Sequence, residues 1–226
     1  MKVLFIGNSH TYMNDMPQLF REIVEKTTGA PCEVTMLAFS GRHLSWHLTE
    51  YFSLRFALLY GGYDFCVIQQ AAHPFPPREE TLADGEAIVQ LCRATHTEPV
   101  LYMTWAEKRQ PENQAKMIET YEALARETHA RLAPVGAIWQ RLQKAHPGLE
   151  LFYKDGEHAS PYGDLLIAAV LCREITGRAD ILLPDHVRDF HWQIPDMQHI
   201  SASLDDQEIR EPIDEEKARW ILEAMK

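Results

Sequence analysis

Residues 2–11, KVLFIGNSHT, join a short apolar run to a turn of small and polar residues. The run from Val3 to Ile6 predicts a buried β-strand that ends at Gly7. Similar short runs recur at residues 33–39, 64–70 and 99–104, and helical patterns separate them. Strands that alternate with helices predict a parallel sheet with helices on both faces. We therefore expect an α/β fold, a three-layer α/β/α sandwich around a central, mostly parallel sheet.

The helical segments are expected at residues 15–28, 43–60, 79–95, 112–132, 137–145, 165–176 and 214–225. Asp15 is the expected cap of the first, and Gly29 is its expected C-terminal stop. After residue 180 the strand–helix pattern weakens. We expect one domain over residues 1–180, with an extension over residues 181–226 packed on the same domain.

The bulk properties exclude several classes of partner. The 226 residues carry a formal net charge of −11, which disfavours binding to nucleic acid or an anionic membrane. The four cysteines lie far apart and mostly in apolar runs, so we expect buried thiols and no disulfide framework. No signal segment precedes the first strand, and no apolar run approaches the roughly 20 residues of a spanning helix. These features predict a cytoplasmic protein.

Three residues carry the side chains that nucleophilic catalysis by a serine requires. Ser9 follows the first strand, and DGEHASPYG at residues 155–163 holds Asp155 and His158 three residues apart. A serine hydroxyl is a poor nucleophile until an imidazole takes its proton, and a carboxylate must orient that imidazole. The spacing of Asp155 and His158 lets the carboxylate reach the ring. We therefore predict a Ser9–His158–Asp155 triad.

Other polar positions follow neighbouring strands of the predicted sheet. Gly41 comes after the second strand, while Gln69 and Gln70 end the third. Ligands bind at the carboxyl ends of parallel strands, so these residues and Ser9 are expected at one rim. A glycine N–H and a glutamine amide can both donate to a developing oxyanion. Side chains alternate along a strand, so only one of the two glutamines is expected to face the site.

The sequence resembles the SGNH (GDSL-type) hydrolases, in a bacterial branch whose first block reads GNS-x-T followed by N-D-x-P. The matching stretches are residues 7–11 and 14–17, and the D-x-x-H block with its following glycine matches Asp155, His158 and Gly163. Gly41 fits the second block. The third block departs, because VIQQAAHP at residues 67–74 lacks the usual asparagine. Related branches carry glutamine there, which makes Gln69 the first choice and Gln70 the second.

The resemblance implies a flavodoxin-like α/β/α fold and an esterase that works through an acyl-enzyme without a metal or organic cofactor. The expected partner is a small-molecule acyl ester, and acetyl and carbohydrate-linked esters are the leading candidates. His73, in a proline-rich loop after the third block, is expected to touch substrate. The alternative is a non-catalytic or phosphate-binding α/β module with the same fold. Two histidine clusters, one at His43 and His47 and one over residues 185–191, are weaker candidates for metal ligands.

Overall fold

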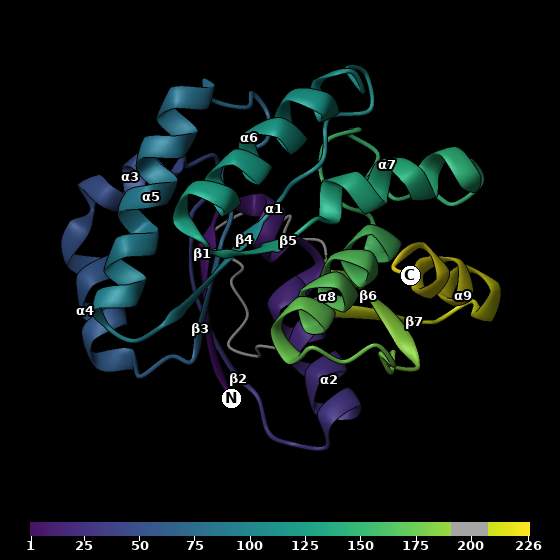
Figure 1. The fold of residues 1–226 in the computed structure, drawn as a ribbon. Helices are drawn as coiled ribbons and strands as arrows, with labels where there is room; N and C mark the ends of the chain where they lie inside the picture. The colour runs from purple at the N-terminus through teal and green to yellow at the C-terminus, as the bar shows by residue number, and fades with distance from the viewer. Residues whose placement is uncertain (191–207) are drawn as a thin grey trace, which may run out of the picture.

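The computed structural model describes residues 1–190 and 208–226 (Figure 1). Five parallel strands form the central sheet in the order β2-β1-β3-β4-β5. They are β1 (Lys2–Gly7), β2 (Glu33–Ala38), β3 (Phe65–Ile68), β4 (Glu98–Tyr102) and β5 (Arg131–Ala133). Helices lie on both faces, so the predicted α/β/α sandwich with a parallel sheet is confirmed.

In Figure 1, α3, α4 and α5 cover one face of the sheet, and α2 and α8 lie on the other side. The helices of the domain are α1 (Ser9–Tyr12), α2 (Met16–Thr28), α3 (Leu44–Thr49), α4 (Tyr51–Gly61), α5 (Arg78–Ala94), α6 (Asn113–Thr128), α7 (Val135–Ala145) and α8 (Pro161–Thr176). A 3₁₀ turn, η1 (Met13–Asp15), joins α1 to α2.

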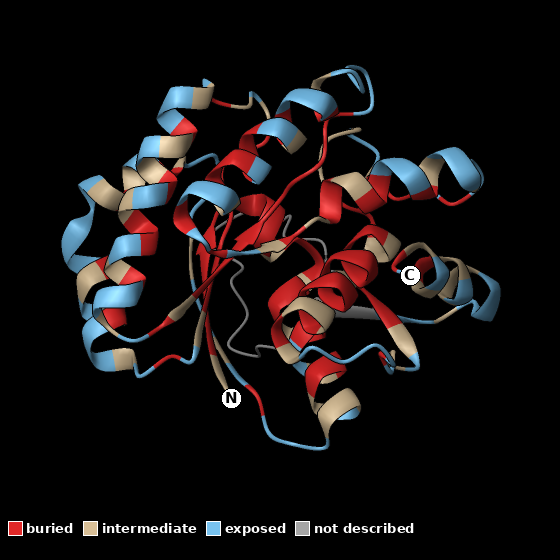
Figure 2. Cartoon of the chain, in the orientation of Figure 1, coloured by how far each residue is buried: buried red, intermediate tan, exposed pale blue. Residues whose placement is uncertain are grey.

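Alternation along β1 builds two hydrophobic cores at once. Val3 and Phe5 pack in one buried cluster with α2 and α8, whereas Leu4 and Ile6 pack in a second cluster on the other face. Successive side chains of a strand point to opposite faces, and a parallel sheet is buried on both. The interior of the sheet is accordingly buried in Figure 2, while the outer sides of α3 and α4 are exposed.

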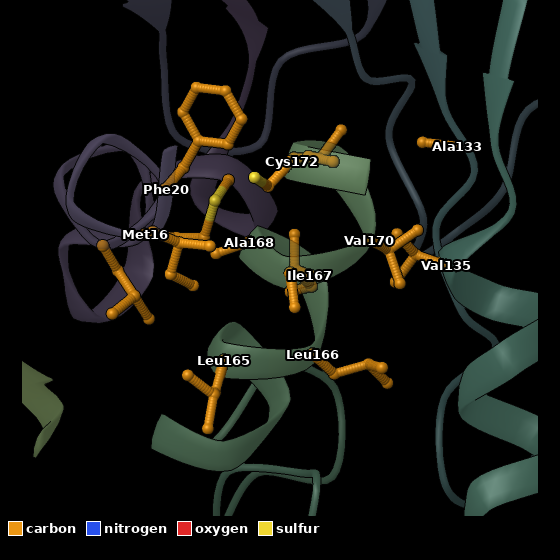
Figure 3. Close-up of a cluster of buried hydrophobic side chains, with 14 of the residues drawn as sticks. Met16, Phe20, Ala133, Val135, Leu165, Leu166, Ile167, Ala168, Val170 and Cys172 are labelled. Atoms are coloured by element: carbon orange, nitrogen blue, oxygen red, sulfur yellow. The ribbon is translucent and has the colours of Figure 1, made fainter. Parts of the chain in front are cut away.

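Helix α8 is the most deeply buried helix segment of the first core. Residues 165–172 of this helix are all fully buried. Figure 3 shows side chains of α8 beside Met16 and Phe20 of α2, with Ala133 and Val135 near its other side. Because α8 begins three residues after His158, this packing fixes the end of the loop that carries the predicted catalytic histidine.

Several boundaries and caps of the elements differ from the sequence-based expectations. Asp15 precedes α2 in a left-handed conformation without a capping hydrogen bond, so the predicted cap is wrong. The single helix expected at residues 43–60 is broken at Glu50 into α3 and α4. Helix α6 ends at Thr128, because His129 is left-handed and residues 131–133 pair with β4 instead. The predicted stop at Gly29, with a φ of 70°, is confirmed.

The described C-terminal segments pack on the same core. Strands β6 (His186–Phe190) and β7 (Glu208–Pro212) pair antiparallel, and α9 (Glu215–Ala224) follows. Val187 and Ile221 are buried in the cluster that contains α8. The Arg188 guanidinium is also buried, and it pairs with Asp15 and Glu22. These contacts support the proposal of one domain, residues 1–180, with residues 181–226 as an extension packed on it.

All four cysteines, at positions 32, 66, 92 and 172, are free and buried, as the sequence predicts. Burial raises the pKa of the Cys32 and Cys172 thiols to about 11, so both stay protonated and inert at neutral pH. Among the described residues, no helix is long and apolar enough to cross a membrane.

Replacing Ile221 with alanine tests whether α9 shares the main core. Ile221 is completely buried, whereas Leu59 on α4 is 46% exposed. Because a buried large-to-small change loses apolar contacts and leaves a cavity, Ile221→Ala should lower the free energy of unfolding by about 2–5 kcal/mol. Leu59→Ala should change it by less than about 0.5 kcal/mol. Chemical denaturation measures both, and equal small losses would contradict the shared core.

Candidate active site

Ser9 opens the short helix α1, directly after β1. Asn8 caps this helix through a hydrogen bond from the His10 N–H to Asn8 Oδ1. The Asn8 amide also donates to the Arg42 carbonyl, at 3.1 Å, and so ties the loop after β2 to the serine turn. Ser9 is 8% exposed, which leaves its hydroxyl at the edge of the buried interior.

The side chain of Gln69 fixes the serine turn, residues 8–11, through hydrogen bonds. Gln69 Oε1 accepts hydrogen bonds from the Asn8 N–H at 2.8 Å and from the Thr11 hydroxyl at 2.9 Å. A Cβ on Gly7 would lie 2.3 Å from that same Oε1, so any side chain there would displace the amide. Glycine at position 7 therefore permits the contact that holds the turn.

The predicted triad residues meet within hydrogen-bonding distance. His158 Nε2 lies 2.8 Å from Ser9 Oγ, and His158 Nδ1 lies 2.7 Å from Asp155 Oδ2. The serine and the histidine are 149 residues apart in the chain. The imidazole thus stands between a hydroxyl on one nitrogen and a carboxylate on the other.

Asp155 is held in its ionised form by the loop that carries it. Its Oδ1 accepts the N–H groups of Glu157 and His158, at 2.9 and 3.0 Å. Partial burial alone would raise the pKa of Asp155, but these N–H donors and the His158 ring together lower it. A carboxylate that stays ionised in this position can orient the imidazole and stabilise its protonated form.

The segment after β4 braces the acid–histidine loop. Trp105 Nε1 donates to the Glu157 carbonyl at 2.9 Å, and the Lys108 N–H donates to the Gly156 carbonyl at 2.8 Å. Arg109 adds an ion pair to the Glu157 carboxylate at 3.1 Å. Trp105 is itself stacked on Trp139, with ring centroids 4.1 Å apart. Both tryptophans are buried core residues, and Trp105 also positions the loop.

Asn14, in the N-D-x-P stretch, joins the serine turn to the far side of the histidine loop. Its amide donates to the Ala159 carbonyl at 3.1 Å and to the Asp164 carboxyl group. Burial raises the pKa of Asp164 well above its usual range, despite the opposing Asn14 hydrogen bond. The Asn14–Asp164 pair is thus a neutral, buried link between η1 and the first turn of α8. The motif quoted from the sequence contained Asn14, but nothing in it predicted this partner.

Three histidine rings gather at the site. The His10 ring stacks on His158, with centroids 4.7 Å apart, and also contacts His73 at 5.0 Å. Burial, followed by the nearby His158 and His73 rings, holds the pKa of His10 well below its usual range, against the effect of the Glu157 carbonyl. Sequence reasoning missed His10. The signal in the sequence that could have identified His10 was its position one residue after Ser9.

The predicted oxyanion residues lie around the serine turn. Gly41 has a φ of +66°, and its loop is tied to Asn8 through Arg42. Gln69 Nε2 donates to the Gln70 carbonyl, so the Gln69 amide is committed to backbone and turn contacts. Gln70 Oε1 accepts from the Leu44 and Ala71 N–H groups, whereas Gln70 Nε2 is buried without a partner among the described residues. These contacts move the expectation from Gln69, the first choice, to Gln70.

The weaker metal candidates have other contacts. His47 Nε2 lies 3.0 Å from the Gly7 carbonyl, and Asp185 pairs with Lys26. His186 lies 3.7 Å from Glu22, and His191 lies outside the described residues. Within residues 1–190 and 208–226, no three His, Cys, Asp or Glu side chains are grouped as a metal site.

Comparison with known proteins relates this fold to solved hydrolases. No family model and no curated protein sequence matches the chain. Its structure resembles a DUF4886 family protein from Bacteroides uniformis, with a TM-score of 0.65, 18% identity and coverage of 100% of this chain and 93% of that one. It also resembles a lipase/acylhydrolase from Enterococcus faecalis, with a TM-score of 0.63, 16% identity and coverage of 81% and 98%.

A third similar structure is a mutant of an acetyl-xylooligosaccharide esterase from Geobacillus stearothermophilus. Its TM-score is 0.63, its identity is 16%, and the match covers 77% of this chain and 93% of that one. At these identities the likeness establishes the fold. The chain therefore shares the α/β fold of these solved structures, in agreement with the α/β/α fold that the resemblance in sequence implied.

The lowered pKa of His73 predicts that the protein loses stability in acid. An unfolded histidine titrates near 6.5, whereas burial lowers the pKa of His73 to about 4 despite attraction by Glu107. Between these values the unfolded chain binds a proton that the native state does not, so the free energy of unfolding falls as the pH falls. His73→Asn should remove about 1–3 kcal/mol of that decline between pH 7 and pH 4.5.

The matched control is His96→Asn, because His96 is exposed and has a φ of 58°, which asparagine tolerates. Chemical denaturation across the pH range measures the free energy of unfolding for each variant. A His73→Asn profile parallel to that of the wild type would show that His73 is not titrating in this range.

Proposed function

We propose that this protein is a serine esterase that cleaves a small acyl ester through an acyl-enzyme, with Ser9, Asp155 and His158 as its triad. The observation that carries the proposal is the unbroken chain of contacts from Asp155 Oδ2 through His158 to Ser9 Oγ, at 2.7 and 2.8 Å. A structural serine has no need of a histidine–carboxylate pair on its hydroxyl, whereas a nucleophile requires one. The fold likeness to structures titled as esterases also supports this reaction class.

In the proposed reaction, Ser9 Oγ attacks the carbonyl carbon of the ester while its proton passes to His158 Nε2. The tetrahedral intermediate then collapses, the bond from carbon to the alcohol oxygen breaks, and Nε2 gives its proton to that oxygen. Water next attacks the acyl group on Ser9, with His158 again as the base, and releases the acid. Asp155 stabilises the imidazolium in both halves. No step requires a metal or an organic cofactor.

The proposed oxyanion donors are the N–H groups of Ser9 and Gly41 and the side-chain amide of Gln70. Gly41 suits this role because nothing lies within 4 Å of the place a Cβ would occupy, which leaves its backbone open to a ligand. Gln70 is 1% exposed, and its Nε2, which has no partner within residues 1–190 and 208–226, is a desolvated donor. An unpaired buried donor costs stability, and a developing oxyanion would satisfy it.

Substitution of the triad tests the reaction class directly. With p-nitrophenyl acetate as substrate, Ser9→Ala and His158→Ala should each lower kcat by about 10⁶-fold, and Asp155→Asn by about 10⁴-fold. The double variant should be little worse than either single one, because the triad acts as a unit. Ser45→Ala, at an exposed serine on α3, should keep wild-type activity. Undiminished hydrolysis by Ser9→Ala would overturn the proposal.

A serine-directed organophosphorus reagent separates this function from the non-catalytic, phosphate-binding alternative. An activated serine reacts stoichiometrically, so mass spectrometry should find one adduct at Ser9 in the wild type and none in Ser9→Ala. A wild-type protein that stays unlabelled would favour the binding module.

The substitution Gln70→Glu isolates the proposed donor. Glutamate keeps the oxygen that accepts from Leu44 and Ala71, and it replaces the amide N–H₂ with oxygen. At pH 8, kcat should fall by about 10²–10³-fold with little change in KM, since the hydrogen bond strengthens in the transition state. Thermal unfolding in parallel checks that the variant is folded. A folded Gln70→Glu protein with kcat within tenfold of wild type would exclude Gln70 from the oxyanion hole.

A further inference from the structure

His10, the residue after the proposed nucleophile, makes a direct ring contact with His158. Its side chain is buried, and its ring stacks on the His158 ring with centroids 4.7 Å apart and an angle of 29° between the planes. A serine, a histidine and a carboxylate do not by themselves require an aromatic ring at this position. His10 thus adds a contact to the proposed general base that the other two triad residues do not provide.

The His10 ring contacts its surroundings through its faces and edges rather than through its nitrogens. Among the residues that the structure describes, neither Nδ1 nor Nε2 of His10 has a hydrogen-bond partner, although both atoms are buried. The ring packs instead against Trp105, at 5.3 Å between centroids, and against His73, at 5.0 Å. Burial holds the pKa of His10 well below its usual range, so the ring is neutral. Its flat shape is therefore the property that its neighbours use.

The backbone of His10 is held at both of its polar groups. Its N–H donates to Asn8 Oδ1 at 3.0 Å, and its carbonyl accepts from the hydroxyl of Tyr102, a buried residue of β4, at 3.1 Å. Ser9 and His10 are also consecutive residues of α1. The nucleophile and the ring surface that contacts the base therefore belong to one fixed turn.

The His158 imidazole needs such a surface because its hydrogen bonds leave one motion free. Contacts at Nδ1 and Nε2, to Asp155 and Ser9, still allow the ring to tilt about the line that joins the two nitrogens. The side-chain torsion that sets a histidine ring plane has only broad preferences of its own. A ring packed against the face of the imidazole opposes this tilt. Proton transfer is efficient only while Nε2 stays aligned with the reacting oxygens.

We propose that His10 is a positioning residue, whose flat ring holds the plane of the His158 imidazole without taking up or giving a proton. The inference rests on the proposed esterase function and extends it to the residue that fixes the general base. One turn of the chain, α1, then sets both the place of the Ser9 hydroxyl and the orientation of the ring that activates it. Another flat ring of similar size should replace His10, whereas an aliphatic side chain of similar volume should not.

The test compares His10→Phe, which keeps a flat ring and removes both nitrogens, with His10→Leu, which keeps apolar volume and removes the ring. With p-nitrophenyl acetate, His10→Phe should retain kcat within about threefold of the wild type. His10→Leu should lower kcat by about 10–100-fold with KM within about twofold, because a tilted base slows the chemical step and leaves substrate binding intact. Labelling of Ser9 by the organophosphorus reagent should slow by the same factor.

The matched control is His146→Leu, which removes a histidine ring that is stacked on Trp220, outside the site, with centroids 4.3 Å apart. This variant should keep wild-type kcat. Incorporation of 2-thienylalanine at position 10 supplies a five-membered ring without a basic nitrogen, and it makes the same comparison if the larger phenyl ring prevents folding. Thermal unfolding shows which of the variants are folded.

The NMR signal of the His158 Nδ1–H, identified by its loss in His158→Ala, gives a readout that does not need turnover. This proton should exchange with water faster in His10→Leu than in the wild type, and at the wild-type rate in the flat-ring variants. A folded His10→Leu protein with kcat within about threefold of wild type would overturn the positioning role and leave the esterase standing.

A folded flat-ring variant as impaired as His10→Leu would also overturn the proposal, because the His10 nitrogens would then take part in the reaction. A wild-type protein that neither hydrolyses the ester nor reacts with the organophosphorus reagent would instead overturn the esterase function itself.

Discussion

The site depends on one buried acceptor, the Oε1 atom of Gln69. It receives the Asn8 N–H and the Thr11 hydroxyl, so it fixes the backbone on both sides of Ser9. Gln69 is 1% exposed, so the Asn8 N–H and the Thr11 hydroxyl could not hydrogen-bond to water in its place. The contact also joins the end of β3 to the end of β1, which are neighbours in the sheet. The position of Ser9 is thus set by a tertiary contact between neighbouring strand ends, through an amide that the sequence of the turn itself does not supply.

His158 is surrounded by one ionised carboxylate and two neutral histidine rings. Asp155 is ionised and bonded to one ring nitrogen, while the two other histidine rings at the site, His10 and His73, have lowered pKa values and stay neutral. Were either ring charged, it would repel the imidazolium at close range. Stacking of the neutral His10 ring on His158 also restricts the plane of the imidazole. Both neutral rings lower the stability of the fold in acid, because the unfolded chain binds protons that these two histidines do not.

The fold class follows from the sequence, because apolar runs that alternate with helical patterns predict a parallel sheet with helices on both faces. The expected meeting of Ser9, Gly41 and the glutamines at one rim followed from the same rule. What the sequence could not supply were contacts made by tertiary packing. The helical pattern of apolar residues continues through Glu50, where the structure has a break, and through Leu132. Helix α6 ends before Leu132 because residues 131–133 pair with β4. Aspartate is a preferred N-cap residue, yet the Asp15 carboxylate accepts a hydrogen bond from Arg188, 173 residues away.

The choice between Gln69 and Gln70 shows the same limit in the site itself. Alternation predicts that one glutamine faces the site, but it does not say which, because β3 ends at Ile68 and the chain then leaves the strand geometry. The structure separates them by their partners: the amide of Gln69 is used within the turn, whereas the N–H₂ group of Gln70 has no partner in the part of the chain that the structure describes. Of this polar pair at a strand end, Gln69 therefore fixes the turn around Ser9, and Gln70 is the one whose amide donor is free, within the described residues, for the oxyanion role proposed above.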